Sequence, residues 1–291
     1  MPQVEHLFLV DNCSKNIEAV KELLRSFESE AGKFSVSLIR EPQNSGIAHA
    51  LNVICNKAIE AGFEQILLLD QDSVSTPGMV ETLAQHASDR VGMIAPMILD
   101  RNKHDIKNVK KYLNSKVFKV KSGTHGDVIT SGTLVNLKAC AFIGGFDDSF
   151  FIDYVDYDFN KRLLLEGYDI IRTDETALIH ECGKAEKTWL FLPFRDENGK
   201  RKFKRFYSFG HSPFRCYYKV RNRILYTKKY APIGAIEGKE GEKQIPFIVI
   251  CTLLCEKNKR EKLKEFRRGI KDGKAQRVKP YKIKRLPKPA P

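Results

Sequence analysis

The first half of the chain alternates short apolar runs with longer segments in which apolar residues recur at helical spacing. The apolar runs predict buried strands at residues 4–10, 36–39, 66–69 and 91–98. The segments between them predict helices at residues 15–27, 47–61 and 77–87. Because strand and helix alternate, the pattern predicts an α/β fold with a mostly parallel sheet that is covered by helices.

The pattern changes after residue 100. Residues 100–127 are polar and basic, which is typical of an excursion or a hairpin. Beyond them, the pattern predicts strands at 128–136, 168–172 and 177–180, and a strand or hairpin at 200–207. It predicts helices at 137–142, 156–166 and 214–230.

Charge is distributed unevenly along the 291 residues. Residues 200–291 contain 28 Lys and Arg against 7 Asp and Glu, a balance of +21, whereas residues 1–199 contain 22 against 29, a balance of −7. We therefore expect a catalytic domain at 1–199, a basic aromatic and helical region at 200–278, and a disordered Pro- and Lys-rich tail at 279–291. A basic region of this size favours a polyanionic partner.

That partner is either an anionic membrane surface or a nucleic acid. The chain has no zinc-ligand spacing and no aromatic RNA-recognition motif, so the membrane is the preferred interpretation. The longest apolar run, residues 245–255, is about half of the roughly 20 residues that a transmembrane helix needs. Seven cysteines without a CxxC pair are typical of reduced thiols in a cytoplasmic protein.

Two carboxylates, Asp70 and Asp72, directly follow the predicted strand at 66–69. Ligands of open α/β sheets bind at the carboxyl ends of the strands. Alternate residues of an extended chain point the same way, so the two carboxylates share one face if that geometry persists. Two carboxylates this near to each other repel unless a cation neutralises them. The pair therefore predicts a metal site for a sugar–nucleotide diphosphate. Capping of a following helix is the alternative.

Several motifs in order resemble family 2 glycosyltransferases of the A-type fold, and among them the rhamnosyltransferase-like members. The resemblance covers residues 4–230. It depends on Val-Asp-Asn at 10–12, Asn44-x-Gly46-x-Ala48-x-Ala50-x-Asn52, Leu-Leu-Asp-Gln-Asp-Ser at 68–73, Ser-Gly-Thr at 131–133, Gly-Gly-Phe-Asp at 144–147, Phe-Phe-Ile-Asp-Tyr-Val-Asp at 150–156, and His180. The family's additional first strand and helix have no counterpart before residue 4, so we expect an N-terminally shortened fold with a basic helical extension.

The resemblance implies a set of residues that bind the nucleotide sugar: Asp11, Asn44, Gly46, Asn52, Asp70, Gly132 and Arg221. Local alternatives remain open. Asp11 is equally typical of a helix entry, and the segment around Gly46 of an ordinary loop. Gly46 has no side chain to block a ligand, and a helix N-terminus favours anions. Arg221 belongs to a predicted basic and aromatic helix, and its guanidinium suits phosphate. The alternative is a helix that only packs on the rest of the protein.

The resemblance also implies a metal site and a catalytic base. Asp72, assisted by Asp70 and His180, would hold Mg²⁺ or Mn²⁺, although a lone histidine is often structural. Asp156 is the preferred base, with Asp153 as the second choice. Asp158 is expected to pair with Arg162 four residues later, and stabilisation of a helix N-terminus by these acids is the alternative.

We therefore expect an inverting, metal-dependent glycosyltransferase that moves a sugar, with rhamnose from dTDP-rhamnose as the first candidate. The expected acceptor is a lipid-linked glycan in cell-surface polysaccharide synthesis. The expected location is the cytoplasmic face of the plasma membrane, to which the basic region binds. The alternatives are an inactive or truncated relative, a nucleotidyltransferase, and a protein that binds nucleic acid through its basic third.

Overall fold

We describe the protein from a computed structural model, in which residues 3–31, 35–121, 128–181, 186–195 and 199–285 are described. The chain divides into two compact units. The first unit contains residues 1–181 and 283–291, and the second contains residues 182–282. Each has its own hydrophobic core. The functional boundaries expected at residues 199 and 278 stay predictions.

The first unit begins with a small parallel sheet. β1 (His6–Asp11) pairs with β2 (Ser35–Arg40) in parallel register. α1 (Ile17–Ala31) connects them, as a parallel pair requires. α2 (Ile47–Glu60) follows and leads to the central sheet.

The central sheet has six strands in the order β3-β7-β5-β8-β4, with β6 also paired to β8. Their bounds are β3 (Gln65–Leu68), β4 (Val74–Ser75), β5 (Val91–Asp100), β6 (Val117–Lys119), β7 (Thr133–Asn136) and β8 (Asp169–His180). Among the described strand pairs of this sheet, only β5 and β8 run parallel. The predicted α/β class is correct, but the central sheet is mixed and not mostly parallel.

The reason for the difference lies in β7, which runs antiparallel to both of its neighbours, β3 and β5. A parallel pair needs a crossover, usually a helix. In the described part of the segment between β5 and β7 there is only the 3-10 helix η1 (Ile106–Lys111) and the short strand β6. The alternation of strands and helices therefore predicts the relative strand direction correctly for β1 and β2, but not for β7 and its neighbours.

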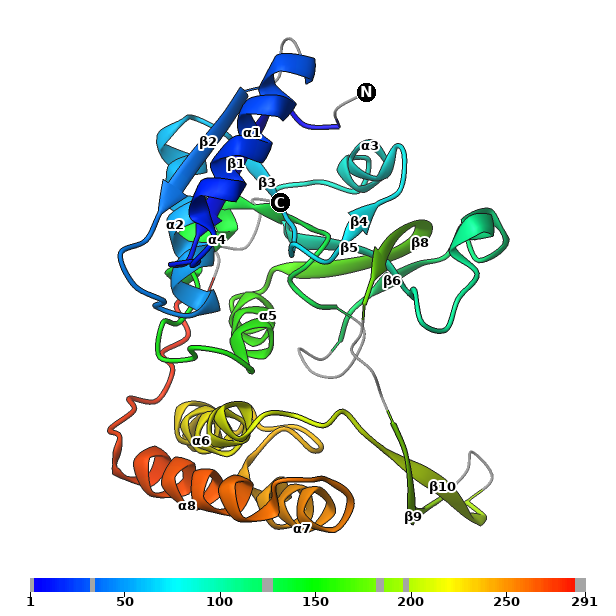
Figure 1. Ribbon diagram of the computed structural model, residues 1–291, viewed down its shortest axis with the longest axis vertical. Coiled ribbons are helices and arrows are strands. Elements are labelled where there is room, and N and C mark those ends of the chain that lie inside the picture. Colours follow the sequence, from blue (N-terminus) through cyan, green and yellow to red (C-terminus); the bar gives the residue numbers. More distant parts are fainter. Residues whose placement is uncertain (1–2, 32–34, 122–127, 182–185, 196–198, 286–291) are drawn as a thin grey trace. The chain divides into compact units, whose positions relative to one another are not determined.

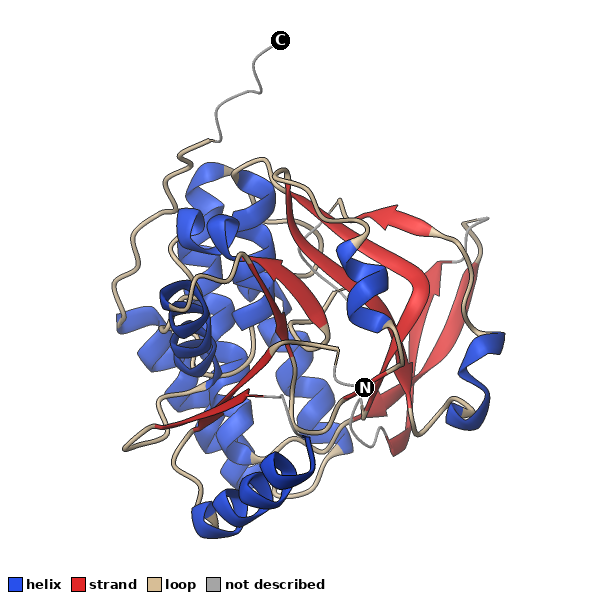
Figure 2. Cartoon of the chain, turned by 90° about the horizontal axis from the view of Figure 1, so that it is seen from above, coloured by secondary structure: helices blue, strands red, loops and turns tan. Residues whose placement is uncertain are grey.

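Helices pack on the central sheet rather than interrupting it (Figures 1 and 2). They are α3 (Met79–Ala84), α4 (Leu137–Ile143) and α5 (Val155–Leu165), and α3 and α5 lie on opposite sides of the sheet in Figure 1. α3 buries Met79 and Leu83 against Ile94, Leu134 and Leu178 of the strands. Ile94, Leu134 and Leu178 belong to the neighbouring strands β5, β7 and β8, so this packing holds three adjacent strands together.

In its described residues, the second unit contains a hairpin and three α-helices. β9 (Glu186–Arg195) and β10 (Arg201–Ser208) form the antiparallel hairpin. The helices are α6 (Pro213–Tyr230), α7 (Ile245–Cys255) and α8 (Lys259–Ala275), with short 3-10 helices η2 (Ala231–Ile233) and η3 (Glu242–Gln244) between α6 and α7. α6 and α8 pack closely because Gly269 and Gly273 have no side chains to hold the helices apart.

The C-terminal tail differs from the expectation in its described part. Residues 286–291 of the predicted disordered tail lie outside the described residues. Residues 283–285 return to the first unit, where the backbone N–H groups of Lys284 and Arg285 donate to the carboxylate of Glu166 at 2.6–3.0 Å. The Lys284 ammonium donates to the carbonyl of Phe142. These bonds to a buried carboxylate explain why a Pro- and Lys-rich composition does not prevent order here.

Two further expectations concern membranes and thiols. In the part of the chain that the structure describes, no helix combines the length and the apolar character needed to cross a bilayer. The six described cysteines are free, and Cys55, Cys140, Cys216 and Cys251 are buried.

Candidate metal centre and catalytic carboxylates

Asp70 and Asp72 lie in a tight turn between β3 and β4. The N–H of Ser73 donates to the carbonyl of Asp70 at 3.1 Å and closes the turn. The extended geometry on which the shared face was conditional does not persist, because strand β3 already ends at Leu68. Asp and Ser favour turns, since their side chains bond to nearby backbone groups.

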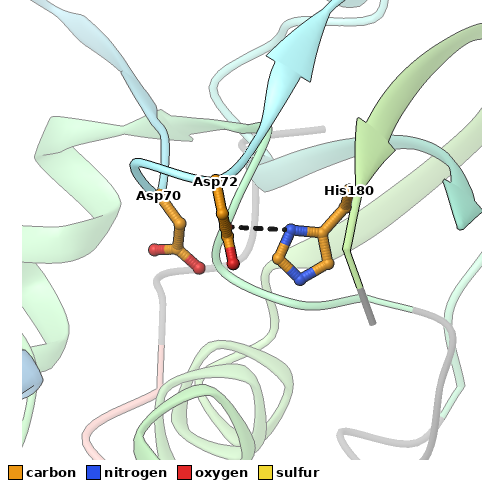
Figure 3. Close-up of side chains that lie close together, drawn as sticks. All are labelled: Asp70, Asp72 and His180. Carbon is orange, nitrogen blue, oxygen red and sulfur yellow. Dashed lines mark ion pairs between the residues drawn. The ribbon is translucent and has the colours of Figure 1, made fainter. Parts of the chain in front are cut away.

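The register of β4 on β8 brings His180 to this turn. Val74 lies opposite Ile179, so the residues before Val74 lie beside His180 at the end of β8. Nδ1 of His180 is 3.3 Å from Oδ1 of Asp72 and 2.8 Å from Oγ of Ser73. The three side chains project into the same space (Figure 3), and one potential ligand atom from each lies within 4.8 Å of the others. The structure thus brings together the three predicted metal ligands.

This cluster is chemically suited to a divalent cation. Partial burial raises the pKa of Asp70, and the charge of Asp72 raises it further, whereas His180 opposes the shift. A cation between the carboxylates would relieve this repulsion. Two carboxylates and an imidazole form a donor set that suits Mn²⁺ and, through its oxygens, Mg²⁺. The side chain of Asp72 is half exposed, which leaves one side of the cluster open to a ligand.

A chain of hydroxyl groups supports the cluster from behind. Oγ of Ser131 accepts a hydrogen bond from the N–H of Asp70 at 2.9 Å and lies 2.8 Å from Oγ of Ser73. Ser73 in turn contacts His180. Both serines are buried. Partners behind metal ligands fix the orientation of the ligands and strengthen binding. Both serines stand in motifs noted in the sequence, but their pairing depends on β3 and β7 being neighbours.

Arg101 is a functional candidate that the sequence analysis missed. It directly follows β5, and its N–H donates to the carbonyl of His180 at 3.1 Å. Its guanidinium Nη2 lies 3.4 Å from the carbonyl oxygen of Asp72. This exposed cation beside the acidic cluster is a natural partner for phosphate oxygens. Its position follows from the pairing of Asp100 with His180 across β5 and β8, which no local pattern reveals.

The predicted base lies at the entrance of α5, where the backbone is unusual. Asp153 and Tyr154 both have positive φ angles, of 63° and 70°. This conformation is costly for residues other than glycine, and it occurs mostly where the surrounding structure imposes it at functional sites. The ring of Tyr154 is buried, with the rings of Phe150 and Tyr157 at 6.4 and 5.1 Å. This packing holds the turn that places Asp156 in the first turn of α5.

The electrostatics of Asp156 connect it to the metal cluster. Burial raises the pKa of Asp156 to about 6, and the charges of Asp153 and Asp70 contribute to the increase. A hydrogen bond from the N–H of Tyr157, at 2.9 Å, acts in the opposite direction. The charge of Asp70 thus contributes to the electrostatics of Asp156 within the first unit. A carboxyl group with a pKa near 6 has the basicity that a general base needs.

Asp158 is a structural residue, as predicted. Its carboxylate is fully buried and pairs with Nε of Arg162 at 2.7 Å, four residues later on α5. Arg162 also donates to the carbonyls of Ile143 and Gly145, at 2.8 and 2.6 Å. This network fixes α5, and with it Asp156, to the end of α4.

Several residues predicted to bind the nucleotide make contacts within the protein. The buried carboxylate of Asp11 accepts from the N–H of Ser14 at 3.1 Å, in the turn that precedes α1. Oδ1 of Asn44 accepts from the N–H of Gly46 at 3.1 Å. Asn52 bonds to both backbone groups of Phe146, at 2.7 and 2.8 Å. These contacts explain why the residue types are needed, and binding of a nucleotide sugar by these side chains stays a prediction.

The two predicted binding glycines have packing roles. At Gly46, where φ is +92°, an added Cβ would lie 2.6 Å from the carbonyl oxygen of Phe151, and the N–H of Ile47 already donates to that oxygen at 2.8 Å. At Gly132, where φ is +79°, a Cβ would lie 2.7 Å from the side chain of Leu178. A side chain at either position would therefore clash within the protein, and contact of these glycines with a nucleotide sugar stays a prediction.

Arg221 belongs to the second unit. On α6 its guanidinium donates to Oδ1 of Asn222 at 2.9 Å and to Oε1 of Gln276 at 2.7 Å. It also lies 5.7 Å from the centre of the Tyr218 ring. Its contact with phosphate stays a prediction.

Comparison with known proteins agrees with this geometry. Residues 2–143 match the model of the family described as Glycosyl transferase family 2. A dTDP-rhamnosyl transferase of Shigella flexneri, RfbF, is 30% identical over 252 residues, which cover 82% of this chain and 78% of that protein.

Similar solved structures include S. aureus TarS 1–349 in complex with UDP-GlcNAc, with a TM-score of 0.54 and 13% identity over 94% of this chain and 73% of that chain. Another is GalNAc-T7 with UDP, GalNAc and Mn²⁺, with a TM-score of 0.53 and 10% identity over 92% of this chain and 50% of that chain. At these identities the likeness is one of fold, and it confirms the predicted A-type fold.

Proposed function

Because the chain belongs to glycosyl transferase family 2, we propose that it transfers rhamnose from dTDP-rhamnose, with inversion, to a lipid-linked glycan at an anionic membrane surface. The observation that carries this proposal is the cluster of Asp70, Asp72 and His180 in the first unit. A further carboxyl group of the same unit is that of Asp156, whose pKa burial raises to about 6 with a contribution from the charge of Asp70. The similarity to a dTDP-rhamnosyl transferase supports the choice of donor.

The acidic cluster would hold a divalent cation. Asp72, Asp70 and His180 offer the ligands, and Ser73 orients the imidazole. When bound, such an ion neutralises negative charge on the diphosphate and stabilises the departing nucleoside diphosphate. Arg101, at the edge of the cluster, adds a second positive charge for the phosphate oxygens.

Asp156 would act as the general base. Its carboxylate takes the proton of the acceptor hydroxyl while that oxygen attacks the anomeric carbon of the donor sugar. The bond between the anomeric carbon and the phosphate oxygen breaks, and its electrons leave with the nucleoside diphosphate. Attack from the side opposite to the leaving group inverts the configuration. Asp153, with its positive φ, shapes the turn that presents Asp156.

The basic third of the chain would bring the enzyme to its acceptor. Residues 200–291 carry a balance of +21, and each Lys or Arg near an anionic leaflet contributes about 1 kcal/mol to binding. The cytoplasmic leaflet is the anionic one, so we place the enzyme on the cytoplasmic face of the plasma membrane. A lipid-linked acceptor in that leaflet then has a high local concentration.

A donor screen tests the proposal. The protein is incubated with dTDP-rhamnose and with UDP and GDP sugars, with and without Mn²⁺, in the presence of lipid extracted from the cells that make it. We expect metal-dependent formation of dTDP and of a rhamnosylated lipid with the inverted anomeric configuration. Turnover of no nucleotide sugar would contradict the proposal and favour an inactive relative. Release of pyrophosphate from a nucleoside triphosphate would favour a nucleotidyltransferase.

A further inference from the structure

α7 is an apolar helix that is exposed along one side. Its sequence, Ile-Pro-Phe-Ile-Val-Ile-Cys-Thr-Leu-Leu-Cys, contains no charged residue. Phe247, Ile250 and Leu254 are nevertheless 45%, 57% and 45% exposed. Their spacing of three and four residues places them on the same side of the helix. Helices that are apolar on all sides are normally buried, so this side needs a partner.

The other side of α7 is packed within the second unit. Ile245 and Cys251 are buried, and Val249 packs against a cluster that includes Phe266 of α8. The helix is therefore held in place, and its exposed side is a fixed feature of the surface. With 11 residues α7 is about 16 Å long, which is too short to cross the roughly 30 Å of a bilayer core.

The hairpin of the same unit exposes a second apolar surface. Trp189, Phe191 and Phe203 are 64%, 49% and 67% exposed. Phe203 lies opposite Pro193, and Arg205 lies opposite Phe191, so Phe191 and Phe203 lie on one face of the hairpin. Trp189 lies on the same strand, beside a shift in the register. A two-stranded hairpin is marginally stable in water without a packed face. Its end is joined to the end of α7, because Oγ of Ser208 donates to the Glu256 carboxylate at 2.5 Å.

Basic residues accompany both apolar surfaces. Lys202, Lys204 and Arg205 are exposed on β10, and Lys257, Lys259 and Arg260 are exposed just after α7. Glu242 and Glu261 are exposed near the two ends of α7, but the balance of residues 200–291 is strongly positive. A helix or hairpin with apolar and aromatic side chains and flanking Lys and Arg is typical of elements that lie in the membrane interface.

We propose that Phe247, Ile250 and Leu254, together with Trp189, Phe191 and Phe203, form an interfacial surface that inserts into the headgroup boundary of an anionic membrane. This inference deepens the proposed membrane location and rests on it. It differs from attachment by charge alone because apolar side chains leave water. A second copy of the chain fits less well as a partner, since it would bring two strongly basic segments together. A glycan would match the aromatic rings, but not the aliphatic side of α7.

The first test measures binding to vesicles of phosphatidylglycerol and phosphatidylcholine by sedimentation. The variant carries F247S, I250S and L254S. A matched control carries L23S, I59S and I106S, which remove three apolar side chains of the first unit that are 68%, 41% and 43% exposed. We expect the partition coefficient of the α7 variant to fall about tenfold or more, with the control unchanged. Light scattering and the affinity for dTDP-rhamnose, both measured without lipid, should be the same in all three proteins.

The second test uses fluorescence, which does not depend on how well the triple variant folds. Trp189 is the only tryptophan of the chain, so its emission reports on the hairpin in the natural protein. In a W189F background, F247W reports on α7 and I106W serves as the control. We expect a blue shift and quenching by brominated lipids for Trp189 and for F247W, but not for I106W.

The outcomes separate this inference from the proposed function. Equal binding of the natural protein and the α7 variant, with no shift for F247W, would overturn the interfacial surface and leave attachment by charge. No binding of the natural protein to anionic vesicles at low salt would overturn both the surface and the membrane location, while the donor screen still tests sugar transfer. A smaller mass of the α7 variant in light scattering would assign the surface to self-association instead.

Discussion

At the scale of single residues, the candidate site brings carboxylates close together although their charges repel. Asp70 and Asp156 both have raised pKa values, and burial is the main cause in each case. The protein thus accepts an electrostatic cost at neutral pH that a bound cation would reduce. Structural acids elsewhere in the same unit behave differently: Asp158 is fully buried but directly paired with Arg162. Raised pKa values of this kind are what we expect of carboxylates that act on a ligand.

The raised pKa of Asp156 predicts the pH dependence of sugar transfer. A base must be deprotonated, so a group with a pKa of about 6 becomes inactive as the pH falls through 6. An ordinary aspartate would stay active down to a pH of about 4. We expect the rate at saturating donor and metal to increase between pH 5 and 7 and to level off above. A rate that is constant down to pH 5 would contradict the role of Asp156.

At the scale of elements, the entrance of α5 depends on its contact with the start of α2. Gly46 lies against Phe151, and the N–H of Ile47 donates to the carbonyl of Phe151. This contact fixes the segment just before the strained residues Asp153 and Tyr154. A change at Gly46 should therefore affect both stability and the position of Asp156.

Gly46→Ala and Gly62→Ala form a matched pair that tests this contact. Both glycines have positive φ angles, +92° and +84°, but only Gly46 has atoms within 4 Å of an added Cβ. We expect Gly62→Ala to cost about 1 kcal/mol of unfolding free energy, and Gly46→Ala to cost about 3 kcal/mol or more because Phe151 must move. Sugar transfer should decrease only in Gly46→Ala. Equal unfolding midpoints in urea for the two variants would show that the contact is unimportant.

Local patterns predicted many of the elements, though not β9, and they did not predict which strands are neighbours. The helix predicted at 214–230 begins one residue earlier, at Pro213, because a proline favours the first turn of a helix. The helix predicted at 47–61 ends one residue earlier, at Glu60. The order of the sheet was not predictable in the same way. β7 inserts between β3 and β5 through pairing of residues that are distant in sequence, and no periodicity carries that information.

The same distinction applies to the site. The Asp-x-Asp motif and His180 could be selected from the sequence because their residue types suit a metal. The motifs of the chain also resemble those of family 2 glycosyltransferases. The turn at Asp70, the hydroxyl chain of Ser131 and Ser73, and the position of Arg101 depend on how β3, β7, β5 and β8 pair. For Gly46 and Gly132 the residue type was noted correctly, but the neighbours that explain it were not predictable.

At the scale of the whole molecule, the chain leaves the first unit after Glu181 and returns to it at Ile283. The returning segment donates two backbone N–H groups, from Lys284 and Arg285, to the buried carboxylate of Glu166. Both ends of the second unit are therefore connected to the first unit in the chain.

Chains that end at Lys282 and at Arg285 test the role of the returning segment. Without residues 283–285, the Glu166 carboxylate loses two hydrogen-bond donors. We expect the shorter chain to lose about 1–3 kcal/mol of unfolding free energy, measured by urea unfolding. Glu166→Gln in the shorter chain should restore part of the loss, because a neutral amide is less costly to bury than a carboxylate. Identical unfolding curves for the two chain lengths would contradict this assignment.

The central claim is that a cation-binding cluster and a separate base act together on a nucleotide sugar. The most direct measurement compares Asp156→Asn with Asp72→Asn, recording the rate of dTDP formation with acceptor and the affinity for dTDP-rhamnose with Mn²⁺. We predict that Asp156→Asn lowers the rate by a factor of about 10² or more while the affinity for the donor is retained. We predict that Asp72→Asn abolishes the effect of Mn²⁺ on donor affinity. A rate in Asp156→Asn close to that of the natural protein, or a Mn²⁺ effect that survives Asp72→Asn, would contradict the account.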